Sequence, residues 1–199
     1  INAITENGWV PNAKLVFKSS RKTGDYHGQM NHPLFTKWFT EMLLPNIPKN
    51  SLIIMDNASY HNVLSENSDP TPNSKKEYIF RWLEEKKAPI CNDMLKAELL
   101  EIMEKMITSP TFVLDEIASE QGHRVLRTPP YHPELQPIEV CWGVVKNEIA
   151  RNCNFTMAGL QKQLDLAFDS VTSKTCSGII KKVRKFEDDY WKEDSALGL

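Results

Sequence analysis

Two acidic residues far apart in the chain occupy positions from which a carboxylate can do chemistry, and the first is Asp56. It directly follows the apolar run LIIM (52–55) and is itself followed by Asn57. Ligands collect at the carboxyl ends of strands in open α/β sheets, so an acid at this point lies where such proteins carry their sites. The alternative is structural, because Asp and Asn side chains commonly bond their own backbone in turns. The residues alone leave both interpretations open.

The second acid, Glu139, stands at the start of a predicted helix. In PPYHPELQPIEVCWGVVK (129–146), Pro137 takes a first helical position and Glu139 lies in the first turn, where the helix dipole favours an acid. Glu139 is therefore either an acid that only stabilises the start of the helix or a residue whose side chain is held in position to act as a ligand. The prolines ahead of it stiffen the loop and fix where its side chain points. Lys146, seven residues further on, shares nearly the same helix face and is either a solvated lysine or a phosphate contact.

Together these stretches resemble the second and third sequence blocks of the mariner-type DDE transposases. The run MDNASYH (55–61) matches the family pattern of an apolar strand ending in D-N-A-x-x-H. The later stretch (129–146) matches P-P-Y-x-P-x-L-N-P-I-E-x-x-W-x-x-x-K, except that Gln136 stands where the family has Asn. The similarity runs over most of the chain and includes TGDYHGQMN (23–31) and HRVLRTPPYH (123–132).

The resemblance implies a two-metal site for phosphoryl transfer. In that family three carboxylates hold two divalent ions, Mg²⁺ or Mn²⁺, which activate the nucleophile and stabilise the leaving oxygen during attack on DNA phosphodiesters. Hard oxygen ligands suit such ions. Asp56 would be the second acid and Glu139 the third, both catalytic and both metal ligands. Asn57, His61 and Lys146 would support this site or contact the substrate.

The first acid of the family has no match in the sequence. The family carries it in the first strand of the fold, whereas this sequence begins at what reads as the second strand, so the domain is expected to be incomplete at its N-terminus. Asp25 in TGDYH is the one candidate substitute, and it falls in a loop. Between Asp56 and Glu139 lie 139 − 56 − 1 = 82 residues, a longer spacer than in many relatives. A helical insertion at about 65–122 accounts for the excess.

Two functions fit this resemblance. The first is a DDE-type transposase or endonuclease domain, which cleaves and transfers DNA strands with a divalent metal. The second is a domesticated, catalytically inactive derivative that binds DNA or protein, and an Asp in an apolar strand ahead of Ile1 would favour the enzyme over it. The partners implied are DNA, as transposon ends or target, and a second copy of the chain in a homodimer. The implied location is the nucleus.

The elements predicted around these residues belong to the α/β class. A hairpin that includes AKLVFKS (13–19) precedes a helix at 35–42, and LIIM reads as a strand covered on both faces. Helical spacing predicts three helices within the insertion and three more after Pro137, with a short strand in HRVLR (123–127) between the two groups. With the resemblance, this order predicts a single ribonuclease H-like domain over 1–199. It would be a mixed sheet flanked by helices, lacking its first strand.

Composition narrows the classes of protein further. With 199 residues and 41% hydrophobic content, the chain is long and apolar enough to bury a sizeable core. Its 24 basic and 26 acidic residues lack the positive excess of many nucleic-acid binders, so any DNA contact must come from local patches. The cysteines form no CxxC pair and the histidines show no zinc spacing, which favours reduced thiols and no structural zinc. No apolar run approaches the length of a membrane span, so no membrane partner is expected.

Overall fold

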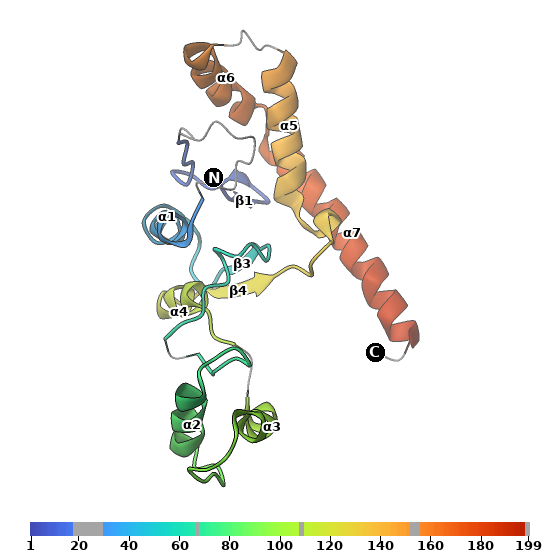
Figure 1. Ribbon diagram of the computed structural model, residues 1–199. Coiled ribbons are helices and arrows are strands. Elements are labelled where there is room, and N and C mark those ends of the chain that lie inside the picture. Colours follow the sequence, from blue (N-terminus) through green and yellow to red (C-terminus); the bar gives the residue numbers. More distant parts are fainter. Residues whose placement is uncertain (18–29, 67, 108–109, 152–155, 198–199) are drawn as a thin grey trace.

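The chain has a mixed α/β structure in which helices dominate and the strands form two small sheets (Figure 1). The structure is a computed structural model. It describes residues 1–17, 30–66, 68–107, 110–151 and 156–197. Asp25, the candidate substitute for the first acid, lies outside these residues, and the other candidate site residues lie within them.

The first sheet is an N-terminal hairpin of two short antiparallel strands. Strands β1 (Ile4–Thr5) and β2 (Gly8–Trp9) pair with Ile4 opposite Trp9. The prediction of a strand at 13–19 is wrong for its described part, because residues 13–17 form no strand. Pro11 has no N–H to continue the ladder, and Asn12 has a left-handed φ of 57°. The backbone therefore leaves the ladder soon after β2.

The second sheet pairs β3 (Leu52–Met55) in parallel with β4 (Arg124–Arg127). Both strands are where the sequence predicts them. The expectation that β3 is covered on both faces is wrong, since Leu52 is 47% and Ile54 51% exposed. The reason is that the alternate residues of β3 pack on the core around the first helix. On the sheet's other face, the described part of the chain leaves the side chains of Leu52 and Ile54 about half exposed.

A helical segment packs against this sheet. It begins as α1 (His32–Trp38), continues as a π-helical turn, η2 (Phe39–Leu43), and ends in a 3₁₀ turn, η3 (Leu44–Asn46). Trp38 donates a hydrogen bond from Nε1 to the carbonyl of Ala13 at 2.6 Å, which ties the helix to the N-terminal segment. The buried residues of this core are Val10, Ala13, Phe35, Trp38, Phe39, Leu43, Leu44, Leu114 and Ala118.

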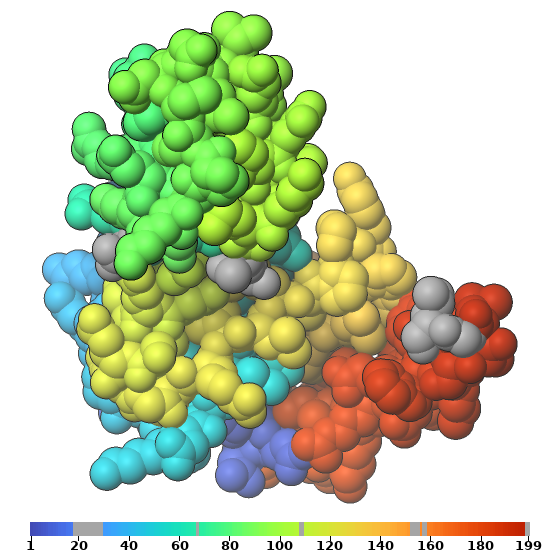
Figure 2. All heavy atoms as spheres, turned by 90° about the horizontal axis from the view of Figure 1, so that it is seen from below, coloured from blue at the N-terminus to red at the C-terminus, as the bar shows by residue number. Residues whose placement is uncertain are grey.

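The predicted insertion contains three helices, and two of them form a lobe with its own core. Helices α2 (Lys76–Glu85) and α3 (Lys96–Met106) pack on each other and project from the rest of the molecule (Figure 2). Their buried residues are Ile79, Trp82, Leu83, Leu99 and Met103. The third helix, α4 (Val113–Glu120), instead packs on β4 and contributes to the core around α1. The lobe is therefore α2–α3 alone.

The C-terminal part is a group of three helices that holds the N-terminal hairpin. These are α5 (Pro137–Arg151), α6 (Met157–Asp169) and α7 (Ser173–Leu197), all three predicted from apolar spacing. Trp9 packs among them, and its Nε1 donates to the carbonyl of Phe168 at 3.0 Å. Among the helices that the structure describes, none is long and apolar enough to cross a membrane.

The described cysteines are free thiols, and two of them serve as core residues. Cys141 on α5 and Cys176 on α7 are buried side by side, whereas Cys91 is exposed. Burial raises the pKa of Cys141 to about 12 and also raises the pKa of Cys176. Because the thiolate is the reactive form of cysteine, a thiol that stays protonated is a poor nucleophile. These two residues therefore pack rather than react.

The separate core of α2–α3 predicts that this lobe can lose stability without the rest of the chain. Leu99→Ala removes a fully buried side chain and should destabilise the lobe by about 2–5 kcal/mol. Leu95→Ala is the matched control, because Leu95 is 67% exposed and its truncation should cost less than about 0.5 kcal/mol. Amide hydrogen exchange measured along the chain reports both. If Leu99→Ala reduced the protection of amides against exchange equally in α1 and in α3, the lobe would not lose stability separately from the rest of the chain.

Candidate functional site

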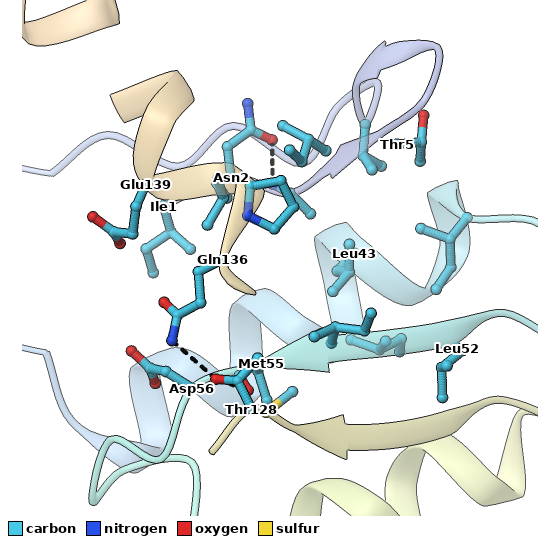
Figure 3. A pocket seen from close by; sticks show the side chains of 18 of the residues that line it. Ile1, Asn2, Thr5, Leu43, Leu52, Met55, Asp56, Thr128, Gln136 and Glu139 are labelled. Atoms are coloured by element: carbon cyan, nitrogen blue, oxygen red, sulfur yellow. Dashed lines mark hydrogen bonds between the residues drawn. The ribbon is translucent and has the colours of Figure 1, made fainter. Parts of the chain in front are cut away.

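A cavity of about 530 Å³ separates the two sheets, and both predicted acids line it. Residues before and within β1 form one wall, and β3 forms the opposite wall. Asp56 and Glu139 lie at the same end of this cavity, one following β3 and the other at the start of α5 (Figure 3). The fold thus brings two acids that are distant in sequence to one opening.

Asp56 leaves β3 in a turn that uses its own carboxylate. Its Oδ1 accepts a hydrogen bond from the N–H of Ala58 at 3.0 Å, which is the local bond expected of an Asp in a turn. The same oxygen lies 2.8 Å from Nδ1 of His61. The side chain is nevertheless 45% exposed, so the carboxylate remains accessible. The turn role and a role in the cavity coexist at this residue.

His61 is buried behind Asp56 and orients it. Its ring centroid lies 4.2 Å from that of Phe35 and 4.5 Å from that of Tyr60, and only 8% of its side chain is exposed. With the proton on Nδ1, the ring donates to the Asp56 carboxylate, and Nε2 is buried with no hydrogen-bond partner in the described part of the chain. A ring packed this tightly has little freedom, so the position of its Nδ1 is set by the core.

Asn57 links the ends of the two parallel strands. Its Nδ2 donates to the carbonyl of Thr128, just after β4, at 2.6 Å. Its Oδ1 accepts from Nδ2 of Asn62 at 3.2 Å. The exposed side of Asn57 faces the second hollow described below. This residue therefore supports the geometry of the turn rather than reaching into the main cavity.

Glu139 lies in the first turn of α5 with an exposed side chain. The residue that precedes the helix, Gln136, places its side chain between Asp56 and Glu139 (Figure 3). Its Nε2 donates to Oγ1 of Thr128 at 2.9 Å. Gln136, which departs from the family pattern, thus ties the start of α5 to the end of β4, so that the strand pair positions both acids.

Lys146 does not belong to the same opening. It is exposed on α5, two turns after Glu139, and it lines neither of the two cavities in the part of the chain that the structure describes. Any role for Lys146 therefore requires a ligand that extends along α5 from the cavity.

A second hollow of about 320 Å³ lies beside Asp56 along the proline-rich loop. Tyr131 on this loop is 98% exposed and has a positive φ of 66°. The loop is anchored by Glu134, whose Oε1 accepts from the hydroxyl of Tyr190 at 2.6 Å and from Nδ1 of His132 at 2.7 Å. These bonds, that of Tyr190 first, lower the pKa of Glu134 to about 2. The sequence analysis missed this anchor, because nothing in the sequence links Tyr190 on α7 to the loop.

The electrostatic effect of the two acids converges on Tyr60, which the sequence analysis did not single out. Burial raises the pKa of the Tyr60 phenol above its ordinary value, and the negative charges of Asp56 and Glu139 raise it further. Two carboxylates that both act on one neutral phenol produce a negative potential at this end of the cavity. Such a potential attracts cations.

The two acids fit a hard divalent cation in chemistry but form a small ligand set. Carboxylate oxygens are the donors that Mg²⁺ prefers, and Mg²⁺ commonly binds through one or two carboxylates together with waters and substrate phosphates. Among the described residues, no group of three or more His, Cys, Asp or Glu side chains is arranged to hold a metal ion. Asp56 and Glu139 therefore suit an ion that takes its remaining ligands from water and substrate.

The comparisons with protein-family models, with curated proteins and with solved structures found no match to this chain. The interpretation of the site thus depends on its own residues and geometry.

The raised pKa of Tyr60 gives a direct test of the shared electrostatics. Asp56→Asn should lower the pKa of Tyr60, because it removes a negative charge and keeps an oxygen that can accept from Ala58. Glu139→Gln should lower it as well, and by less, because its charge is the smaller cause. The pKa is measured by NMR titration of the assigned Tyr60 ring signals. Glu134→Gln is the control and should leave the pKa of Tyr60 unchanged. If Glu139→Gln also leaves the pKa of Tyr60 unchanged, the charges of the two acids do not act together on this residue.

Proposed function

We propose that this chain is a metal-dependent DNA strand-cleaving and strand-transferring domain of the mariner-type DDE transposases, with a ribonuclease H-like fold. The observation that carries the proposal is the convergence of Asp56 and Glu139 on one end of one cavity, where both raise the pKa of Tyr60. These are the two acids that the resemblance assigns to metal binding. They come from different elements separated by a long insertion, so their meeting is not a consequence of sequence proximity.

The fold around the site is compatible with this proposal. Asp56 stands at the carboxyl end of β3, which pairs in parallel with β4, and Glu139 begins the helix that follows β4. Carboxyl ends of parallel strands are the usual position of ligand sites in α/β proteins. Helix α4 packs on β4, and α1 shares a core with β3. Helices α5 and α7 contribute residues to the lining of the cavity.

In this proposal Asp56 and Glu139 hold the divalent cation, Mg²⁺ or Mn²⁺. When bound, such an ion activates the attacking oxygen and neutralises charge on the phosphate and the leaving oxygen. His61 fixes the orientation of the Asp56 carboxylate, and Asn57 holds the turn against the end of β4. Lys146 would contact a phosphate of DNA that runs along α5 from the cavity. The half-exposed Asp56 and the exposed Glu139 leave room for substrate oxygens and water.

DNA is the proposed partner, with a second copy of the chain in a homodimer and a nuclear location. The net charge of −2 means that the chain as a whole does not attract DNA. A cation held between Asp56 and Glu139 would reverse the local sign where a phosphate must approach. Binding should therefore depend on divalent metal near the site as well as on basic residues elsewhere.

A second candidate is a catalytically inactive, domesticated domain that binds DNA or protein. The observation in its favour is that, within the described residues, no third carboxylate groups with Asp56 and Glu139. Asp56 also has a structural role in the turn, which would keep it useful without catalysis. The two candidates differ in whether strand cleavage depends on Glu139.

Glu139→Gln separates the two candidates. The amide keeps the shape of the side chain and removes the charge that would hold the cation, so nicking of supercoiled DNA with Mg²⁺ or Mn²⁺ should fall by about a hundredfold or more. DNA binding should change little, because affinity comes mainly from basic residues on phosphates. Glu148→Gln, an acid-to-amide change on the same helix, is the matched control and should retain activity.

Protein that binds DNA, nicks nothing with either metal and is unaffected by Glu139→Gln would support the inactive domain. Nicking that survives Glu139→Gln would contradict the assignment of this residue.

A further inference from the structure

Gln136 stands at the point where the two hollows of the candidate site meet. Among the described residues, only Asp56, Thr128 and Gln136 line both hollows, and Glu139 lines the larger one. The side chain of Gln136 extends between the carboxylates of Asp56 and Glu139 (Figure 3). An amide therefore lies between the two acids to which the proposed function assigns a cation.

The hydrogen bonds of Thr128 decide which end of this amide faces the site. Nε2 of Gln136 donates to Oγ1 of Thr128 at 2.9 Å. The Thr128 hydroxyl in turn donates to the carbonyl of Met55, 3.5 Å away, so it is an acceptor toward Gln136. An amide rotated by half a turn would place its oxygen against a hydroxyl whose proton is directed elsewhere. The nitrogen is therefore bound at the end of β4, and the oxygen Oε1 is left to the site.

Neither acid can satisfy this amide oxygen. Oε1 of Gln136 accepts no hydrogen bond from the described part of the chain, and the side chain is half-buried. A half-buried acceptor without a partner costs free energy. The ionised carboxylates of Asp56 and Glu139 accept hydrogen bonds and donate none, so they offer Oε1 no proton. Three side chains that present only oxygen lone pairs thus converge, and a cation between them is the partner that all three can share.

The start of α5 holds Gln136 and Glu139 at a fixed spacing. The N–H of Glu139 donates to the backbone carbonyl of Gln136 at 3.1 Å, which closes the first turn of the helix. Residues three apart on a helix are neighbours on its surface, and Pro137 between them has a restricted φ. The bond to Thr128 holds the other end of the Gln136 side chain. The amide oxygen is therefore positioned before any ion binds.

We propose that Oε1 of Gln136 is a third protein ligand of the divalent cation that Asp56 and Glu139 hold. The inference rests on the proposed function and deepens it, since it assigns one of the positions otherwise left to water. Amide carbonyls are hard oxygen donors, as carboxylates are, and they carry no charge. Two carboxylates already balance the charge of a divalent ion, whereas a third would leave the site negative where a phosphate must approach.

Tb³⁺ luminescence tests this assignment without measuring activity. Tb³⁺ is a hard cation that binds oxygen ligands, and its luminescence lifetimes in H₂O and D₂O count the waters bound to it. The signal of the site is the part that Asp56→Asn removes. Gln136→Met keeps the length of the side chain and removes its oxygen, whereas Gln136→Glu keeps an oxygen ligand. Gln161→Met, the same change at an exposed position of α6, is the matched control.

Gln136→Met should weaken Tb³⁺ binding by about tenfold or more and raise the number of bound waters by about one, because a water replaces the lost oxygen. Gln136→Ala, which adds no bulk, should give the same two changes and serves if the methionine variant does not fold. Gln136→Glu should bind Tb³⁺ at least as tightly as the original chain, with the same number of waters. Gln161→Met should change neither quantity.

The outcomes separate this inference from the proposed function. If Tb³⁺ binds at the site and neither Gln136→Met nor Gln136→Ala changes its affinity or its water count, the inference is overturned and the proposed function stands. Weaker binding with an unchanged water count also overturns it, because Gln136 then acts only by positioning the acids. If no Tb³⁺ signal of the original chain depends on Asp56 and Glu139, both the inference and the proposed function are overturned.

Discussion

The parallel ladder between β3 and β4 decides where the candidate site lies. Two strands that run in the same direction end at the same edge of their sheet, so the turn after β3 and the loop after β4 must start side by side. The turn carries Asp56, and the loop leads to the start of α5, where Glu139 lies twelve residues after the end of β4. Asn57 closes the junction by donating to the carbonyl of Thr128, and Gln136 donates to the hydroxyl of the same residue. Thr128 thus accepts one hydrogen bond from the turn that carries Asp56 and another from the residue before the helix that carries Glu139.

Arg127, the last residue of β4, holds this junction to the rest of the core. Its guanidinium donates to the carboxylate of Asp115 on α4 and to the carbonyl of His61, and it also bonds Asn62. The group lies 4.1 Å from the ring centroid of Phe112, in cation–π geometry. The Arg127 side chain is only 13% exposed, and it needs such partners because an unpaired buried cation is strongly destabilising. The same bonds fix the turn that places His61 against Asp56, so core stability and site geometry share one side chain.

The sequence predicted the elements with strong periodic signals and missed the features that depend on distant partners. The apolar run before Asp56 and the proline before Glu139 mark a strand end and a helix start, and both are where local rules place them. The hairpin was misplaced because strands of two residues carry almost no pattern. The exposure of Leu52 was missed because an apolar run has the same composition whether one face or both are covered. The anchor between Glu134 and Tyr190 has no local signature, since it depends on how α7 packs.

The central claim is that Asp56 and Glu139 bind one divalent cation between them, and Mn²⁺ reports this directly. Paramagnetic Mn²⁺ broadens the NMR signals of nuclei close to it, so substoichiometric Mn²⁺ should broaden the amides of residues 56–58 and 137–140 together. Excess Mg²⁺ should restore them, and Asp56→Asn should abolish the effect at both segments. Broadening of only one segment, or broadening spread over exposed acids such as those at 187–189, would contradict a shared site.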